Sequence, residues 1–172
     1  MKFATFAGAS ALAVLLTGCA GSISQPVALS ALSKDQLSTI HISHITGDAA
    51  SDVVITPDEI ASIDQKVQAY IRVDSPSVMV DPATGDALTM KIHITRFDRG
   101  SAVARAILIG LGQIHIDATV SLVKSDGTSA GEYKVKKTFA LGGVVGAVTR
   151  VEDVEEGFAK SVAEIVKEKK DT

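Results

Sequence analysis

Three segments in the second half of the chain alternate apolar and polar residues with a period of two. They read LTMKIHITRF at 88–97, QIHIDATVSLVK at 113–124 and EYKVKKTFAL at 132–141, the last interrupted by Lys137. Successive side chains of a β-strand point to opposite faces, so each segment is expected to be a strand with one buried face. Asp126-Gly127, between the last two segments, predicts a hairpin turn. The alternation therefore predicts a mainly antiparallel sheet.

Two further segments carry helical patterns. TPDEIASIDQKVQAYIR begins with Thr56 as N-cap, has Pro57 at the first helical position and places Glu59 where it completes a capping box. A last helix is expected over about 150–169, where acids near its start are explained better by the helix dipole than by acid–base catalysis. Weaker strand patterns lie at 37–46 and within 75–87. We expect an α+β fold, a mainly antiparallel sheet of about four strands with two helices packed on one face.

The N-terminus carries an export pattern. Lys2 precedes an uncharged apolar run at 3–16, which is shorter than the roughly 20 residues that span a bilayer. The next residues, Leu16-Thr17-Gly18-Cys19, resemble the lipobox of bacterial lipoproteins. This resemblance implies that the Cys19 sulfur receives a diacylglycerol, that the preceding peptide is removed, and that acyl chains such as palmitate hold the protein on a membrane. An ordinary secreted protein with a stray cysteine is the alternative.

The expected organisation follows from that cysteine. We expect a lipoprotein signal peptide at 1–18, a lipidated tether at 19–34 and a single periplasmic α+β domain at 35–172. Residue 20 is alanine rather than aspartate, which by resemblance to known sorting rules implies release to the outer membrane, with the domain on its periplasmic face. Because the chain has one cysteine, a disulfide framework is excluded.

Composition narrows the function classes. A net charge of −3, the lack of tryptophan and an aromatic content of 4% argue against nucleic-acid binding, which uses basic grooves and stacking rings. The chain lacks a G-x-S-x-G motif and its cysteine is expected to be acylated, so no nucleophile is marked and we do not expect an enzyme. Neither a metal nor a cofactor is expected. The histidines are His41, His44, His93 and His115; the last two could approach each other on neighbouring strands, but two imidazoles alone make a poor zinc site, which takes three or four ligands.

Two apolar segments rich in glycine lie outside the expected strands and helices. They are RGSAVARAILIGLG at 99–112 and LGGVVGAV at 141–148. The first leads into one strand of the expected hairpin and the second leaves the other, so both should emerge side by side at one end of the sheet. Three interpretations remain open: packing on the core, an exposed patch for a partner, for self-association or for a bilayer surface, and a phosphate cradle. The candidate interaction residues are Gly100, Arg105, Ile109, Gly110, Gly112, Gly142, Gly143 and Val145.

Arg105 has apolar neighbours in this sequence and needs a partner if it is buried. It could cap carbonyl groups of the adjacent loop, pair with an acid of the last helix, or bind an anion.

The region from Leu88 to Lys167 also carries a family resemblance. Phe97-Asp98-Arg99-Gly100 matches an F-x-x-G step, and Ala104-Arg105 leads to the glycines at 110 and 112. In these motifs the chain resembles a family of bacterial lipoproteins known as domain of unknown function four-four-one-zero. The resemblance implies an envelope lipoprotein and offers no catalytic residues.

Together these features predict a lipid-anchored, non-catalytic envelope lipoprotein that acts as an accessory or adaptor protein. It would dock through the end formed by 99–112 and 141–148, onto an envelope protein or a second copy of itself. The alternative is a small-ligand or lipid-binding module with its pocket under the same loops.

Overall fold

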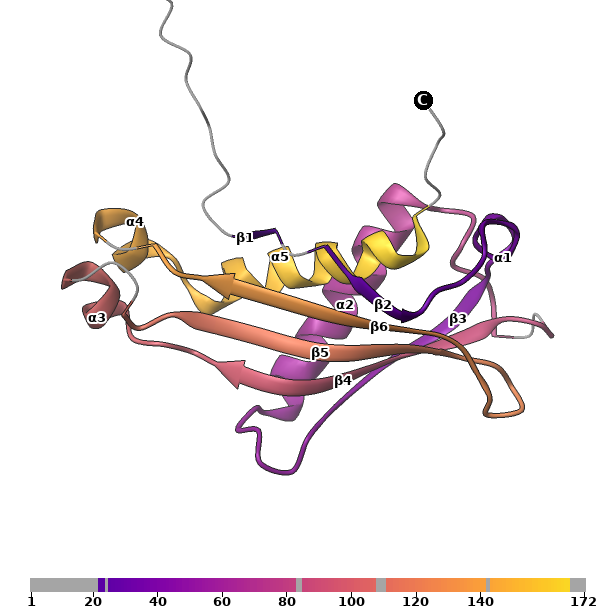
Figure 1. The fold of residues 1–172 in the computed structure, drawn as a ribbon, viewed down its shortest axis with the longest axis horizontal. Helices are drawn as coiled ribbons and strands as arrows, with labels where there is room; N and C mark the ends of the chain where they lie inside the picture. Colours follow the sequence, from indigo (N-terminus) through magenta and orange to yellow (C-terminus); the bar gives the residue numbers. More distant parts are fainter. Residues whose placement is uncertain (1–21, 24, 83–84, 108–110, 142, 168–172) are drawn as a thin grey trace, which may run out of the picture.

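The computed structural model describes residues 22–23, 25–82, 85–107, 111–141 and 143–167. Its centre is one six-stranded sheet, in which β3, β4, β5 and β6 follow one another and both β1 and β2 pair with β6 (Figure 1). The strands are β1 (Ser22–Ile23), β2 (Val27–Ser30), β3 (Ile42–Ala49), β4 (Leu88–Asp98), β5 (Ile114–Val123) and β6 (Ser129–Phe139).

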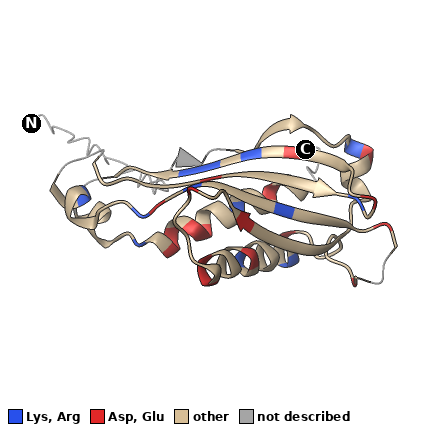
Figure 2. Ribbon diagram, turned by 90° about the horizontal axis from the view of Figure 1, so that it is seen from below, with Lys and Arg blue, Asp and Glu red and all other residues tan. Residues whose placement is uncertain are grey.

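Two long helices, α2 (Pro57–Asp74) and α5 (Val151–Ala163), cover one face of the sheet, whereas its other face is open (Figures 1 and 2). The shorter elements are α1 (Lys34–Ser38), α3 (Ala102–Ile107), α4 (Gly143–Val148) and the 3-10 turn η1 (Glu164–Val166). The prediction of an α+β fold with helices on one face is confirmed in outline.

The core lies between the helices and the inward-facing positions of the sheet. On β5 every second residue is buried, as the alternation predicts. Full burial of one large aliphatic side chain contributes about 1.5–3 kcal/mol, so this row is a main source of stability. The fully buried side chains of β5 are Ile114, Ile116, Val120 and Leu122.

Lys137 interrupts the apolar series of β6, and the structure explains how it is accommodated. Its side chain lies against Gly157 of α5, where an added Cβ would lie 2.7 Å from the Lys137 Cε atom. The missing side chain at Gly157 therefore leaves room for a lysine on the inner face.

The sheet differs from the expected one in size and in direction. It has six strands rather than about four, and β3 runs parallel to β4. The parallel pair arises because α2 crosses over between these two strands and returns the chain to the same end. Alternation gives the buried face of a strand but carries no information on its direction.

Three boundaries also differ from expectation. The segment 37–46 begins as α1, because Ser33 and Gln36 form a capping box, and the strand starts only at Ile42. Within 75–87 the structure has a single bridge from Met79 to Ile42 rather than a strand. The last helix ends at Ala163 and continues as η1.

Part of the segment expected as a tether lies on the sheet. Residues 22–23 and 27–30 pair with β6, and the Leu32 side chain is 7% exposed. The Leu32 N–H donates to the Tyr133 hydroxyl at 3.0 Å. The physical reason is that β6 would otherwise present an unpaired edge, which these short strands complete.

The opposite edge of the sheet, β3, is protected differently. The Gly47 N–H donates to a carboxylate oxygen of Asp64 on α2 at 2.7 Å. An added Cβ at Gly47 would lie 2.8 Å from the same carboxylate, so glycine is needed for this approach. Burial raises the pKa of Asp64, and the Gly47 N–H opposes that shift. An edge N–H that is already bonded to Asp64 does not invite strand addition.

Candidate functional site

Helices α3 and α4 lie together at one end of the sheet (Figure 1). Helix α3 connects β4 to β5, and α4 follows β6. Because β5 and β6 form an antiparallel hairpin, the start of one and the end of the other meet at this end. The structure therefore brings together the two glycine-rich segments in the way that the hairpin topology predicts.

The buried side chain of Arg105, on α3, links α3 to the backbone of α4 and of the loop before β5. It is 3% exposed, and its guanidinium donates to three backbone carbonyls. Nε binds the Gly146 oxygen at 2.9 Å, Nη1 the Gly112 oxygen at 2.7 Å and Nη2 the Thr149 oxygen at 3.0 Å. Of the three alternatives for this side chain, the structure has the capping of loop carbonyls.

Two glycines allow the backbone to cross itself beside Arg105. Gly100 and Gly112 have φ values of +62° and +65°, which favour glycine. An added Cβ at Gly100 would lie 2.2 Å from the Gly112 oxygen, and one at Gly112 would lie 2.3 Å from the Ser101 oxygen. The Gly112 oxygen also accepts the Ser101 N–H at 3.1 Å. This loop thus turns a carbonyl oxygen inward to Arg105, which does not favour a phosphate cradle.

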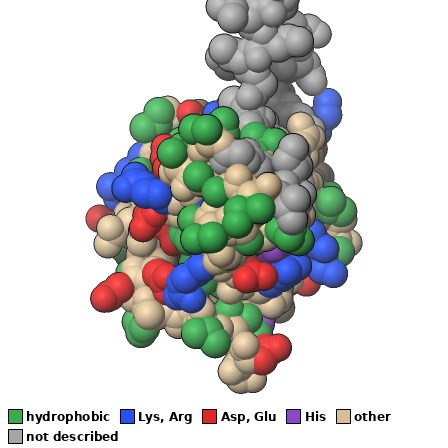
Figure 3. All heavy atoms as spheres, turned by 90° about the vertical axis from the view of Figure 1, so that its left-hand side faces the viewer, with side chains coloured by type: hydrophobic (Ala, Val, Ile, Leu, Met, Phe, Trp, Pro, Cys, Tyr) green, Lys and Arg blue, Asp and Glu red, His purple; other side chains and the backbone are tan. Residues whose placement is uncertain are grey.

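The outside of α3 and α4 is apolar. Their only buried side chain among the described residues is Arg105, so this part of 101–109 does not pack on the core. The large aliphatic side chains at this end are between 52% and 82% exposed, and Figure 3 shows hydrophobic side chains gathered there. We define the apolar tip as Val103, Ile107, Leu111, Val144, Val145 and Val148.

The charged residues within the two segments that carry the apolar tip are arginines, and the acids Glu152 and Asp153 follow soon after Arg150. Neither 99–114 nor 140–151 contains an aspartate or a glutamate. Arg150 lies next to α4 with a side chain that is 74% exposed. Arg99 lies before α3, stacks over Phe97 at 5.0 Å and pairs with Glu59 at 2.7 Å. Figure 2 shows the acidic residues mainly on the helical layer.

Most of the expected site residues have a place in this arrangement. Gly100, Arg105 and Gly112 form its interior, Gly143 begins α4, and Val145 belongs to the apolar tip. Ile109, Gly110 and Gly142 lie outside the described residues, as does Cys19. Sequence reasoning missed Gly146, whose added Cβ would lie 2.3 Å from the Leu141 oxygen and 3.1 Å from the Arg105 Cβ.

Three acids of α5 have structural partners. Asp153 accepts the N–H of Arg150 at 2.8 Å and so caps the helix. Glu155 is buried and pairs with Lys66 at 2.5 Å. Glu156 accepts the Tyr70 hydroxyl at 2.7 Å, and burial together with this glutamate raises the pKa of Tyr70 to about 12. The contacts of Glu155 and Glu156 join α5 to α2.

The histidines do not form a metal site. His93 lies opposite Thr119 and bonds Asp48 at 2.5 Å, whereas His115 lies opposite Asp98 and bonds Thr138 at 3.1 Å. Burial lowers the pKa of His115, and Arg96 adds to that shift. Within the described part of the chain, no three metal-ligating side chains come together.

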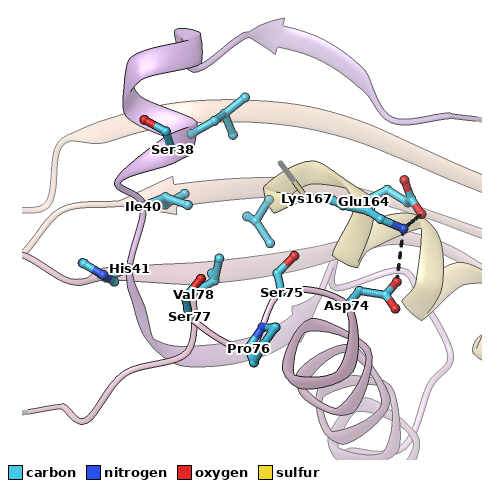
Figure 4. A pocket seen from close by; sticks show the side chains of 12 residues that line it. Ser38, Ile40, His41, Asp74, Ser75, Pro76, Ser77, Val78, Glu164 and Lys167 are labelled. Carbon is cyan, nitrogen blue, oxygen red and sulfur yellow. Dashed lines mark hydrogen bonds and ion pairs between the residues drawn. The ribbon is translucent and has the colours of Figure 1, made fainter. Parts of the chain in front are cut away.

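A hollow of about 780 Å³ lies at the other end of the molecule (Figure 4). It is lined by α1, the end of α2 and η1, and Lys167 lies on its wall between Asp74 at 3.5 Å and Glu164 at 3.3 Å. The predicted pocket lay under 99–112 and 141–148, whereas this hollow lies at the opposite end of the sheet. The Lys167 ammonium is already neutralised by two carboxylates.

Comparison with known proteins finds a family match for part of the chain. Residues 60–143 match the model of a family described as Domain of unknown function (DUF4410). Residues 60–143 of the chain are therefore similar to the DUF4410 family. The match covers the sheet centre, α3 and the start of the α4 loop, so the apolar tip lies partly within it. A comparison with curated proteins finds no significant match.

Among solved structures, the chain resembles PelC from Paraburkholderia phytofirmans, a dodecamer. One PelC variant has a TM-score of 0.57 and 11% identity, and the likeness covers 85% of this chain and 97% of PelC. A second PelC structure has a TM-score of 0.55 and 11% identity, with 80% and 92% covered. This likeness shows a shared fold. Among the described residues of the chain, none of the helices has the length and hydropathy to span a membrane.

Proposed function

We propose that this protein is a lipid-anchored, non-catalytic accessory protein on the periplasmic face of the outer membrane. The observation that carries the proposal is the position of β1, which starts three residues after Cys19 and pairs with the end of β6 beside the apolar tip. The first described strand and the exposed apolar surface therefore both lie toward the end at which β6 finishes, and an anchor just before β1 would lie on that side. The open sheet face and the hollow remain available to envelope partners.

The direct test is the mass of the mature N-terminus. We expect protein purified from bacterial membranes to begin at Cys19 and to carry a diacylglycerol and a further acyl chain. Density-gradient separation of the membranes should place it in the outer-membrane fraction. An unmodified thiol, or cleavage at another bond, would contradict the proposal.

We also propose that copies of the chain associate with one another. The support is the shared fold with PelC, whose solved structures are dodecamers. Native mass spectrometry of the acylated protein in detergent should then give a multimer of defined size. A monomer throughout the accessible concentration range would argue against self-association, although it would leave the lipid anchor intact.

The ligand-binding alternative rests on the hollow beside α1. Its volume of about 780 Å³ is in the range of small-molecule sites. If a ligand is bound there, protein purified from its native membrane should release it on denaturation, and Ser77→Trp should abolish the binding. An empty extract would favour the accessory role alone.

A further inference from the structure

We propose that the apolar tip is a second membrane contact, which inserts into the headgroup region of the lipid bilayer next to the acylated cysteine. This inference rests on the proposed lipid anchor and adds to it the surface of the folded domain that faces the bilayer. Four observations support it: the direction of β1, the chemistry of the tip, the state of its backbone carbonyls and its lack of aromatic side chains.

The direction of β1 points the chain that precedes it toward the end of the sheet that carries the tip. Ser22 pairs with Thr138 and Ile23 with Lys137, so β1 is antiparallel to β6. Followed backward toward Cys19, β1 therefore points in the direction in which β6 runs toward α4. An extended chain covers at most about 3.6 Å per residue, so the Cα atom of Cys19, three residues before Ser22, lies within about 11 Å of that residue.

The chemistry of the tip suits a lipid surface. Its six aliphatic side chains come from two short helices and one loop, and all are at least half exposed. Carboxylates are absent from both sequence segments, while Arg150 lies at the rim with a side chain that is 74% exposed. Aliphatic side chains can enter the acyl boundary, and arginine at the rim attracts anionic headgroups.

Several backbone carbonyls at the end of α4 are hydrogen-bonded within the protein and so do not need water as a donor. An unsatisfied carbonyl is costly in a lipid environment, and the last turn of a helix normally leaves several. Here the Gly146 and Thr149 oxygens are bonded by the Arg105 guanidinium. The Val145 oxygen accepts from both the N–H and the hydroxyl of Thr149, at 3.2 Å and 2.8 Å. These bonds satisfy the Val145 and Gly146 carbonyls in the last turn of α4 and the Thr149 carbonyl just after it, which lowers the cost of removing water from this part of the backbone.

The same surface is a poor match for a protein partner. Interfaces between proteins are enriched in aromatic residues, methionine and arginine in their centres. The apolar tip consists of valine, isoleucine and leucine, and the described residues of α3 and α4 include no aromatic side chain. A bilayer needs no shape complementarity, so flexible placement of small aliphatic side chains suffices.

The test uses the single native cysteine. Because Cys19 is acylated in the proposed protein, a cysteine introduced elsewhere is its only free thiol. We would attach an environment-sensitive fluorophore to Val144→Cys in the acylated protein and reconstitute it in vesicles of phosphatidylethanolamine and phosphatidylglycerol. Val73→Cys is the matched control, because Val73 is 77% exposed, close to the 82% of Val144, and lies at the end of α2 near the hollow. Val103→Cys on α3, 71% exposed, is the second variant if the first does not fold.

The expected result separates the two ends of the molecule. The label at 144 should be quenched by spin-labelled lipid and be several-fold less accessible to aqueous iodide than the label at 73. Equal iodide access at both positions, with the protein bound to vesicles, would overturn the inference. A label at 144 that is shielded from iodide and from lipid would also overturn it, in favour of a protein interface.

The lipid anchor of the proposed function is tested separately from the membrane contact of the tip. The acyl chains are measured by intact mass before labelling, so a protein without them contradicts the anchor itself. An acylated protein whose tip remains in water contradicts only the inference about the tip.

Discussion

At the scale of single residues, Arg105 holds α3 and α4 together. Its three hydrogen bonds reach carbonyls that lie before β5 and at the end of α4. A buried guanidinium that loses its partners, or carbonyls that lose the guanidinium, would each be left unsatisfied. The position of the apolar tip therefore depends on this side chain.

Replacing Arg105 with methionine should loosen the tip without unfolding the sheet. Loss of three charge-assisted hydrogen bonds should lower the local opening free energy by about 2–4 kcal/mol. Hydrogen exchange should accelerate in 99–112 and 143–149 and stay slow in β5. Arg96→Met is the control, because that side chain is 49% exposed on β4. Unchanged exchange at the tip would show that Arg105 does not hold it.

Gly112 and Gly127 provide a matched pair of substitutions. Both have positive φ, but an added Cβ at Gly127 meets nothing within 4 Å, whereas one at Gly112 meets backbone at 2.3 Å. Gly127→Ala should cost about 1 kcal/mol from its conformation alone. Gly112→Ala should cost about 3 kcal/mol or more in urea unfolding, because backbone must move. If both substitutions lower the free energy of unfolding equally, the backbone contact between Gly112 and Ser101 is not close enough to exclude a Cβ atom.

At the scale of elements, two polar contacts fix the helices on the sheet. Glu59 in the first turn of α2 accepts both from Thr56 and from Arg99, which follows β4. Lys66 in the middle of α2 pairs with the buried Glu155 of α5. The first contact joins a helix to a strand end, and the second joins the two helices.

Glu59→Gln should reduce stability in a pH-dependent way. Burial raises the pKa of Glu59, but hydrogen bonds from Thr56 and Arg99 outweigh it, so the net pKa lies below the ordinary 4.5. A lowered pKa gives stability that is present above pH 4.5 and is lost as the pH falls through the folded value. Thermal unfolding should show a cost of about 1 kcal/mol at pH 7 and a smaller one near pH 3. A cost that does not change with pH would contradict the role of the charge.

Lys66→Met should be more damaging than removal of both charges. The single change leaves Glu155 buried without its cation and should cost about 2–3 kcal/mol, less than for a fully buried pair because the Lys66 side chain is 27% exposed. Lys66→Met with Glu155→Leu should recover most of that loss in urea unfolding. If the double variant is less stable than the single Lys66→Met variant, the prediction is wrong and the penalty does not come from an unpaired Glu155.

The sequence predicts those elements whose pattern is local. The capping box at Thr56, the alternation of β4 and β5 and the turn at Asp126-Gly127 are found as expected. The direction of β3 and the pairing of 22–30 with β6 were not predictable, because both depend on contacts between distant segments. The side-by-side placement of α3 and α4 was predictable from hairpin topology, but the interior role of Arg105 remained one of three alternatives.

At the scale of the whole molecule, the chain has two different ends. The apolar tip, the buried Arg105 and the pairing of β1 lie at one end, and the hollow lined by α1, α2 and η1 lies at the other. The sheet connects them, with polar residues on its open face. In the orientation proposed above, the apolar tip faces the bilayer and the hollow faces away from it.

The most direct test is a paramagnetic relaxation profile of the acylated protein on nanodiscs that contain a gadolinium-chelating lipid. An apolar tip that faces the bilayer should give the strongest broadening in α3 and α4, a decline along β5 and β6, and the weakest effect at the turn of 124–128 and beside the hollow. A gradient in the opposite direction, or equal broadening across one sheet face, would contradict it.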